Sequence, residues 1–195
     1  MSDRRFDASQ AARLDDPARL AWLPPQEVVD ALSIRAGDAI ADIGAGTGYF
    51  TLPLAQAVGA HGKVHAVDSQ AEMLEHLRKK LNGQGTAIIQ LIHAEADTTT
   101  LPEASCDLVF LANVWHEFPD RRQVLRESRR ILKPGGRIAI LDWRPDVERE
   151  AGPPLDHRLS EEDAAAALGA EGFQQIADSH AGKYSWLVEA TLEGR

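Results

Sequence analysis

The sequence predicts an α/β protein with a doubly wound, mainly parallel sheet, and three observations support this fold class. Apolar strand-like segments alternate with helix-like segments from Ala39 onward, as in βαβ units. The first strand-like segment runs into a glycine-rich turn that opens a helix. The last two strand-like segments are joined by a short turn, which fits an antiparallel hairpin at the end of the sheet.

The boundaries of these elements follow from the spacing of apolar residues and from the glycine, proline and asparagine residues that end helices and strands. A first strand runs through Ile40 and Ile43, and later strands are predicted at 63–67, 86–93, 107–112, 137–143, 173–177 and 185–191. Helices are predicted at about 49–58, 70–81, 121–132 and 161–168. Ser69 is the predicted N-cap of the second of these helices, with Glu72 completing a capping box.

The residues before Gly37 differ from this alternating pattern. A short helix, broken by Pro24 and Pro25, is predicted to precede a second helix at about 26–32. We therefore expect a single domain over residues 1–195. In it, residues 1–36 form a helical extension or lid, and residues 37–195 form the core.

Composition narrows the classes of partner. The formal net charge of −9 argues against a sequence-independent phosphate-binding surface, so no nucleic-acid partner is expected. The arginines at 121–130, beside Glu127, are expected to form a solvated helix face. No apolar run reaches the ~20 residues that span a membrane, and the N-terminus lacks a signal-peptide core, so we expect a cytoplasmic protein with no integral membrane association. The expected oligomeric state, a monomer or homodimer, does not follow from these features. Cys106 is expected to fill the core, and no metal site is predicted.

The glycine-rich turn after the first strand is the first candidate functional segment. Gly44, Gly46 and Gly48 let bare backbone and helix N–H groups approach a ligand. Asp42 precedes them, an unusual place for a charge in a buried strand unless a partner satisfies it. The alternative is a glycine-rich turn with no ligand. Tyr49 stands where dinucleotide-binding turns carry glycine or alanine, which disfavours a nicotinamide dinucleotide.

Further polar or aromatic residues follow the later strands. In an open α/β sheet, ligands bind beyond the carboxyl ends of the strands. The candidates at these ends are Asp68, Asp97, Asn113, His116, Asp142 and Trp143. The carboxylate of Asp68 can accept both hydroxyls of a ribose, although it can also cap the following helix.

These segments resemble the motifs of the class I S-adenosylmethionine-dependent methyltransferases, and the resemblance covers nearly the whole chain. DIGAGTGY is similar to the first motif, whose glycine backbone wraps the amino-acid part of the cofactor while the acid, here Asp42, helps hold its ammonium. VD ending at Asp68 is similar to the ribose-binding motif. AEADTTTLP is similar to the adenine-binding segment, which implies that Asp97 accepts from the adenine amino group and that the Thr98 N–H faces the ring.

The resemblance implies S-adenosylmethionine as cofactor, S-adenosylhomocysteine as product, and a Rossmann-like seven-stranded sheet of order 3-2-1-4-5-7-6 with strand 7 antiparallel. The cofactor-binding residues that it implies are Asp42, Gly44, Ala45, Gly46, Gly48, Asp68, Ser69, Asp97, Thr98 and Asn113. CDLVFLANVWHEF and RRILKPGGRIAILDW further resemble the small-molecule branch that includes the ubiquinone- and menaquinone-type methyltransferases of quinone biosynthesis.

A second group of residues is predicted on the side of the methyl acceptor. The members of this group are Trp22, His116, Asp142, Trp143, His157 and Arg158. His116 can act as catalytic base or orient an acceptor, or it can simply bond the loop backbone. His157 and Arg158 can bind an anionic substrate, or they can cap the helix near Ser160. Trp22 can line a lid or pack as ordinary core.

We therefore expect methyl transfer to a small acceptor, in particular an aromatic one, through an oxygen or carbon nucleophile. NVWHE differs from the N/D-P-P-Y/F motif of enzymes that methylate nucleobase or glutamine nitrogens, and a single cysteine disfavours arsenite methylation. At 195 residues the chain has little room for a large cap, which disfavours a long-tailed quinone. The alternatives are a regulatory protein that binds S-adenosylmethionine without catalysis, and an NAD-dependent oxidoreductase, which Tyr49 and the terminal hairpin disfavour.

Overall fold

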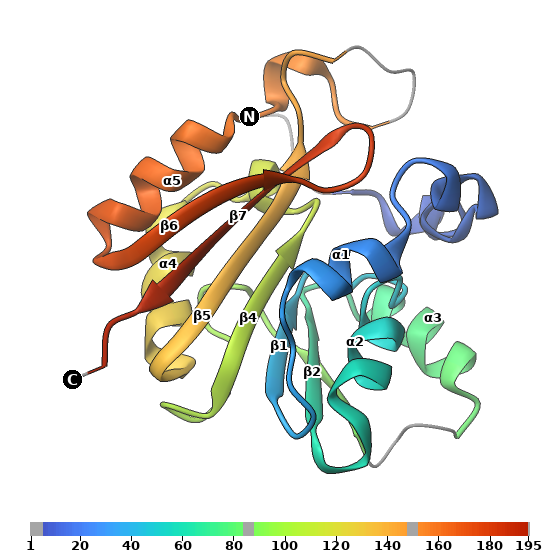
Figure 1. The fold of residues 1–195 in the computed structure, drawn as a ribbon. Helices are drawn as coiled ribbons and strands as arrows, with labels where there is room; N and C mark the ends of the chain where they lie inside the picture. The colour runs from blue at the N-terminus through green and yellow to red at the C-terminus, as the bar shows by residue number, and fades with distance from the viewer. Residues whose placement is uncertain (1–5, 84–87, 148–151, 195) are drawn as a thin grey trace.

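The computed structural model describes residues 6–83, 88–147 and 152–194, which fold around a seven-stranded sheet (Figure 1). Its strands are β1 Ala39–Ile43, β2 Lys63–Asp68, β3 Ile89–His93, β4 Cys106–Ala112, β5 Leu132–Trp143, β6 Phe173–His180 and β7 Ser185–Leu192. The strand order is β3-β2-β1-β4-β5-β7-β6, with β1 to β5 parallel and β7 antiparallel to both of its neighbours. The predicted sheet order and its antiparallel strand are confirmed.

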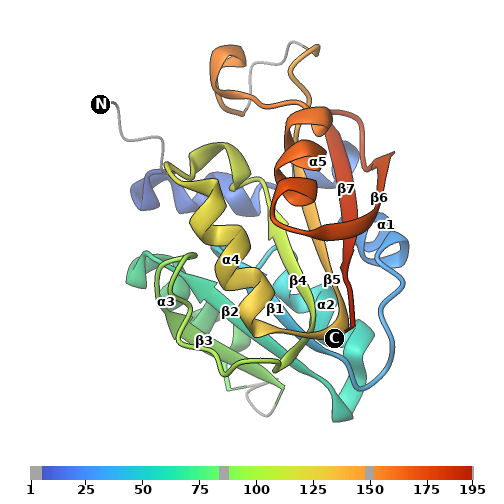
Figure 2. The ribbon, with the colours of Figure 1, turned by 90° about the vertical axis from the view of Figure 1, so that its left-hand side faces the viewer.

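Helices cover both faces of this sheet. The α-helices of the described residues are α1 Pro25–Ala31, α2 Thr51–Val58, α3 Ala71–Leu81, α4 Arg121–Ile131 and α5 Glu161–Ala170. The short 3-10 turns are η1 Ala8–Asp15, η2 Pro17–Ala21, η3 Gly59–His61, η4 Trp115–Glu117 and η5 Leu155–His157. Figure 2 shows α4 and α5 in front of the sheet, with α1 and α2 behind it. No helix in the described part of the chain is long and apolar enough to cross a membrane.

The central strands divide their side chains between two hydrophobic cores. In β4, Leu108 and Phe110 pack in the core beneath α1, α2 and α3, whereas Val109 and Leu111 pack in the core beneath α4 and α5. This alternation follows from the two-residue repeat of a strand. Cys106 is fully buried at the start of the same strand, as predicted.

The start of β5 differs from the prediction. Leu132 already pairs with Cys106, and after a register shift the pairing continues from Arg137, opposite Leu108. The proline and glycines between Leu132 and Arg137 are therefore an irregularity within the strand and not a turn before it. The predicted start of the third strand, at residue 86, lies outside the described residues.

The cap of α3 also differs from the prediction. The N-cap is Gln70 and no side chain bonds in the manner of a capping box, so the predicted pair of Ser69 and Glu72 is wrong. Instead, Asp68 Oδ1 accepts the Gln70 N–H at 2.9 Å. A carboxylate is the stronger acceptor for a helix N–H, because the hydrogen bond is charge-assisted.

The helix α4 has the predicted exposed arginines but not a fully solvated face. Glu127 is only 8% exposed, and its Oε1 accepts from the Thr99 hydroxyl and N–H at 2.5 and 2.9 Å. Arg130 donates to both oxygens of Glu127 at 2.7 Å. This acid therefore ties the loop before β4 to α4.

Candidate active site

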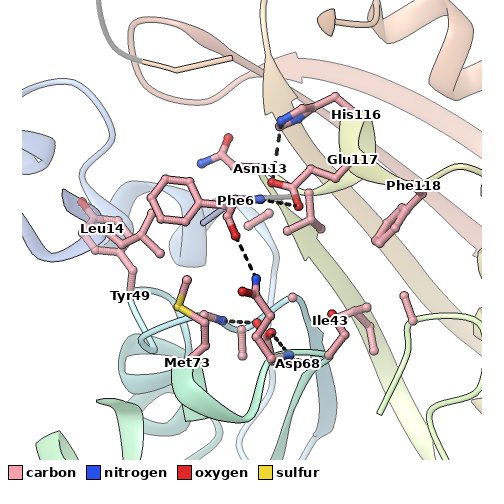
Figure 3. Close-up of a pocket in the computed structure, with 18 of the residues that line it drawn as sticks. Phe6, Leu14, Ile43, Tyr49, Asp68, Met73, Asn113, His116, Glu117 and Phe118 are labelled. Atoms are coloured by element: carbon pink, nitrogen blue, oxygen red, sulfur yellow. Dashed lines mark hydrogen bonds and ion pairs between the residues drawn. The ribbon is translucent and has the colours of Figure 1, made fainter. Parts of the chain in front are cut away.

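A cavity of about 810 Å³ lies at the carboxyl ends of β1, β2 and β4 (Figure 3). This volume is at the upper end of the range for ligand pockets, and it gives room for two small molecules side by side. The predicted site residues that line it are Trp22, Asp42, Gly44, Ala45, Gly46, Asp68, Ser69, Asp97, Asn113, His116, Trp143 and His157. The cavity therefore brings together most residues of both predicted groups.

The glycine turn is hydrogen-bonded to β2, and its backbone lines the cavity. The N–H groups of Gly44 and Ala45 both donate to the Val67 carbonyl, at 2.8 and 3.0 Å. Gly44 has a φ of +73°, and a Cβ built on it lies 2.5 Å from Val114 Cγ1. Since a side chain would meet both a strained backbone angle and its neighbour, this position requires glycine.

Asp42 is a buried carboxylate at the end of β1. It is 2% exposed, and the Thr51 hydroxyl donates to its Oδ2 at 2.6 Å. Burial raises the pKa of Asp42 to about 7, an effect that the Thr51 bond opposes and the charge of Asp68 reinforces. Such a carboxylate favours a cationic ligand, because a positive charge offsets the cost of burying it.

Asp68 and Asn113 add further hydrogen-bond acceptors. Asp68 is 8% exposed and accepts from the N–H groups of Gly46 at 2.8 Å and Gln70 at 2.9 Å. Burial raises the pKa of Asp68, and these two N–H groups oppose the shift. Asn113 Oδ1 is buried without a hydrogen-bond partner among the described residues. We name Asp42, Asp68, Asp97 and Asn113 the acidic end of the cavity.

A second part of the cavity wall is made of rings. Trp22 and Trp143 lie with their ring centroids 5.2 Å apart. Arg19 lies 3.9 Å above the Tyr49 ring, and the Tyr49 hydroxyl donates to the Leu23 carbonyl at 2.6 Å, so the segment that carries Trp22 is fixed against the glycine turn. We call this part of the cavity the aromatic end, and the residues that define it are Trp22, Trp143, Phe118, His116, Glu117 and His157.

Two titratable residues of η4 face this aromatic end. His116 Nδ1 lies 2.9 and 3.0 Å from the two carboxylate oxygens of Asp142, and its Nε2 lies 3.9 Å from Glu117 Oε1. Burial lowers the pKa of His116, but Asp142 and Glu117 outweigh it and leave that pKa above its ordinary value. Burial raises the pKa of Glu117 to about 7, although His116 and the Phe6 N–H oppose it.

Two predicted cofactor contacts are corrected by the structure. Gly48 does not line the cavity, because it faces α3, where a Cβ built on it lies 2.3 Å from Leu77 Cδ1. Thr98 does not line it either, and its N–H donates to the Glu95 carbonyl at 3.1 Å. Gly48 therefore permits close helix packing, and the Thr98 N–H is used inside its own loop.

Two predicted substrate contacts are also corrected. Arg158 is 7% exposed and donates to the carbonyls of Pro153, Arg144 and Val147, so it braces the loop after β5. Asp142 is 1% exposed and accepts the N–H groups of His116 and Trp143 at 2.9 and 2.8 Å. It lies behind His116, where it orients the ring.

Among the lining residues that sequence reasoning missed, Glu117 and Phe6 make polar contacts in the site. Glu117 follows His116 directly, and the signal for it was a second titratable residue in the same loop after β4. Phe6 gave no signal, because its contacts come from distant parts of the chain. Its N–H donates to Glu117 Oε2 at 3.3 Å, and its carbonyl accepts from the Gln70 side chain at 2.9 Å. The first described residue thus bridges the cavity between η4 and α3.

A sheet of this order, with a glycine turn and buried acids at the carboxyl ends of β1 and β2, defines a class I S-adenosylmethionine-dependent methyltransferase. Residues 41–140 match the methyltransferase domain family, and the chain belongs to that family. It also resembles a solved S-adenosylmethionine-dependent methyltransferase from Aquifex aeolicus, with a TM-score of 0.90 and 32% identity. That match covers 96% of this chain and 100% of the other.

Curated relatives come from quinone biosynthesis. The ubiquinone/menaquinone biosynthesis C-methyltransferase UbiE of Hahella chejuensis is 36% identical over 163 residues, which are 83% of this chain and 63% of the relative. The demethylmenaquinone methyltransferase of Geobacillus stearothermophilus is 32% identical over 117 residues, which are 60% of this chain and 50% of the relative. The chain thus spans between half and just under two thirds of the length of these relatives.

The acidic end fits S-adenosylmethionine, the cofactor of this class. Its polar side chains are acceptors, and the cofactor offers an ammonium, ribose hydroxyls and an adenine amino group as donors. Asp42 and Asp68 are carboxylate acceptors there, and Asn113 Oδ1, which has no partner among the described residues, is a further acceptor. Among the described residues, no group of three or more His, Cys, Asp or Glu side chains is arranged to hold a metal ion.

Proposed function

We propose that this protein transfers the methyl group of S-adenosylmethionine to a small hydroxylated aromatic acceptor, at carbon or oxygen. The observation that carries the proposal is one cavity with an acidic end for the cofactor and an aromatic end that holds His116 and Glu117. The names of the curated relatives, which act in quinone biosynthesis, favour a hydroquinone-like ring and methylation at carbon.

The chain's own residues have three tasks in this reaction. The bound cofactor supplies an electrophilic methyl group, so the protein needs to position the acceptor, exclude water and manage one proton. Trp22 and Trp143 offer apolar faces against which a planar acceptor can lie. His116 and Glu117 are the polar groups next to such a ring, and they meet its hydroxyl.

We also propose that residues 1–36 act as a lid. Phe6 bonds to both sides of the cavity, through Glu117 and Gln70. The Thr47 hydroxyl of the glycine turn donates to Asp15 at 2.6 Å, and Lys80 pairs with the same carboxylate. These contacts would place the extension over a bound cofactor and keep water from it.

Mass spectrometry of the ligand retained by the purified protein tests this function. We expect S-adenosylhomocysteine or S-adenosylmethionine, and calorimetry should show that S-adenosylhomocysteine binds while NAD does not. Tritium from labelled S-adenosylmethionine should then appear in 1,4-dihydroxynaphthalene, a tailless hydroquinone. Binding of NAD alone would overturn the proposal. Cofactor binding without transfer to any hydroxylated ring would instead favour a regulatory protein.

A further inference from the structure

We infer that His116 donates a hydrogen bond to the acceptor hydroxyl oxygen, and that Glu117 accepts the proton which this oxygen gives up. The inference rests on the proposed methyl transfer to a hydroxylated acceptor, and it names the residues that handle the proton. Of the roles that the sequence left open for His116, it selects the one that orients the acceptor, and it gives the role of base to Glu117.

The surroundings of His116 favour its doubly protonated form. Asp142 is fixed by the backbone N–H groups of His116 and Trp143, so both of its oxygens stay beside His116 Nδ1. Glu117 lies on the other side of the ring, with its Oε1 3.9 Å from Nε2. A ring between two carboxylates keeps its proton and acts as a donor at both nitrogens.

The gap between His116 and Glu117 fits one hydroxyl. At 3.9 Å, Nε2 and Oε1 are too far apart for a direct hydrogen bond, yet an oxygen about 2.8 Å from each can lie between them. Figure 3 shows both side chains at the cavity, with the Phe6 N–H bonded to the Glu117 carboxylate. That N–H donates to Oε2 of Glu117 at 3.3 Å, and the other carboxylate oxygen, Oε1, is the one that lies 3.9 Å from His116 Nε2.

The proton step is balanced within these groups. The acceptor O–H bond breaks, the proton moves to Glu117 Oε1, and the electron pair stays on the acceptor oxygen. The Nε2–H of His116 then stabilises the negative charge on that oxygen, or on a ring carbon conjugated with it. When a ring carbon is methylated, the C–H bond at that carbon then breaks, its electron pair restores the aromatic ring and its proton leaves to water. The acceptor oxygen takes its own proton back from Glu117, so one proton is released overall.

The charges on the neighbouring elements support this division. Around His116, Asp142 of β5 and Glu117 of η4 favour the cation, while burial and Arg121 of α4 oppose it, and the net result is a raised pKa. Around Glu117, burial together with Asp142 and Asp68 of β2 brings the pKa to about 7, which is suitable for a base at neutral pH.

Nitrogen-15 NMR of histidine-labelled protein tests the state of His116 without any ligand. The chain has seven histidines, and a His116→Gln variant assigns the signal. At pH 7 we expect protons on both ring nitrogens, and we expect Asp142→Asn to return the ring to its neutral form. A wild-type ring with a bare Nε2 at pH 7 would overturn the inference, whereas failure of cofactor binding would overturn only the proposed function.

The role of Glu117 is tested by Glu117→Gln, which keeps the shape of the side chain. We expect the affinity for S-adenosylhomocysteine to change less than about threefold, while methyl transfer to 1,4-dihydroxynaphthalene falls at least about 100-fold, the scale of a general-base contribution. The rate should also lose its rise with pH near 7. Glu75→Gln, at an exposed glutamate of α3, is the matched control and should leave transfer unchanged. A Glu117→Gln enzyme that keeps the wild-type rate and pH profile would overturn the inference.

Discussion

The two ends of the cavity are built from the same sheet in different ways. The acidic end is made of backbone and short side chains at or just after the carboxyl ends of β1 to β4, which lie along one edge of the sheet. The aromatic end joins residues from distant segments, such as Trp22 of the extension and Trp143 of β5. One end is therefore a property of the sheet, while the other depends on how loops and the extension pack over it.

This difference explains what each end can recognise. A glycine turn with buried carboxylates presents fixed acceptors, which suit one ligand of constant chemistry. The aromatic end has few polar groups and large apolar faces, so its shape and its rings select the partner molecule. Conservation of a cofactor and variation of an acceptor within one fold follow naturally from such a division.

The largest expected effect comes from Gly44→Ala, which would disturb both ends together. The new Cβ would lie 2.5 Å from Val114 Cγ1 at a φ of +73°, and Val114 precedes His116 in the same loop. Backbone strain and overpacking should together lower the free energy of unfolding by about 2–5 kcal/mol. Urea denaturation measures this loss, and calorimetry should show that binding of S-adenosylhomocysteine is lost or severely weakened.

Gly135→Ala is the matched control for that variant. Gly135 also has a positive φ, of +77°, but a Cβ there meets nothing within 4 Å. It should lose only the backbone contribution of about 1–2 kcal/mol and keep its cofactor affinity. Equal losses of stability and affinity in the two variants would show that the contact with Val114 has no role.

A smaller effect is expected from Asp68→Ala, which removes one carboxylate of the acidic end. Loss of a charged acceptor should weaken binding of S-adenosylhomocysteine by about 1–3 kcal/mol, as measured by calorimetry. Stability should fall as well, because the N–H groups of Gly46 and Gln70 lose their partner.

Asp68→Asn separates these two effects. Its amide oxygen can still accept one of the two N–H groups, so more of the stability should remain while the charge is lost. An unchanged affinity in Asp68→Ala would contradict the ribose assignment and leave Asp68 as a purely structural cap of α3.

The same contrast explains how much the sequence could predict. The sheet order came from the resemblance to a known class of methyltransferase, and that resemblance rests on motifs in which strand, turn and acid are neighbours in the chain, as for Asp42 and Gly44. The predicted substrate contacts of Arg158 and Asp142 were wrong because each side chain has several possible hydrogen-bond partners. Arg158 bonds three carbonyls of its own loop, and Asp142 turns behind His116, and neither choice is encoded by spacing along the chain.

Contacts between distant segments were the least predictable. Phe6 meets Glu117 across 111 positions, and the rings of Trp22 and Trp143 meet only after the extension has folded over the sheet. Periodicity gives the face of an element but not the partner from another part of the chain. Glu117 could be seen as a polar neighbour of His116, yet its burial beneath Phe6 could not.

The smallest effect on binding is expected from Trp22→Ala, which tests whether the aromatic end binds the acceptor separately from the cofactor. Affinity for S-adenosylhomocysteine should change less than about threefold, because Trp22 packs against the rings of Trp143 and Tyr184. In the presence of S-adenosylhomocysteine, binding of 1,4-dihydroxynaphthalene should weaken by about 0.5–1.5 kcal/mol, the range for one aromatic contact. Calorimetry measures both affinities, with Leu20→Ala as control at an exposed position of η2. If cofactor affinity fell as far as probe affinity, the two ends would form one binding unit, and Trp22 would be part of the cofactor site.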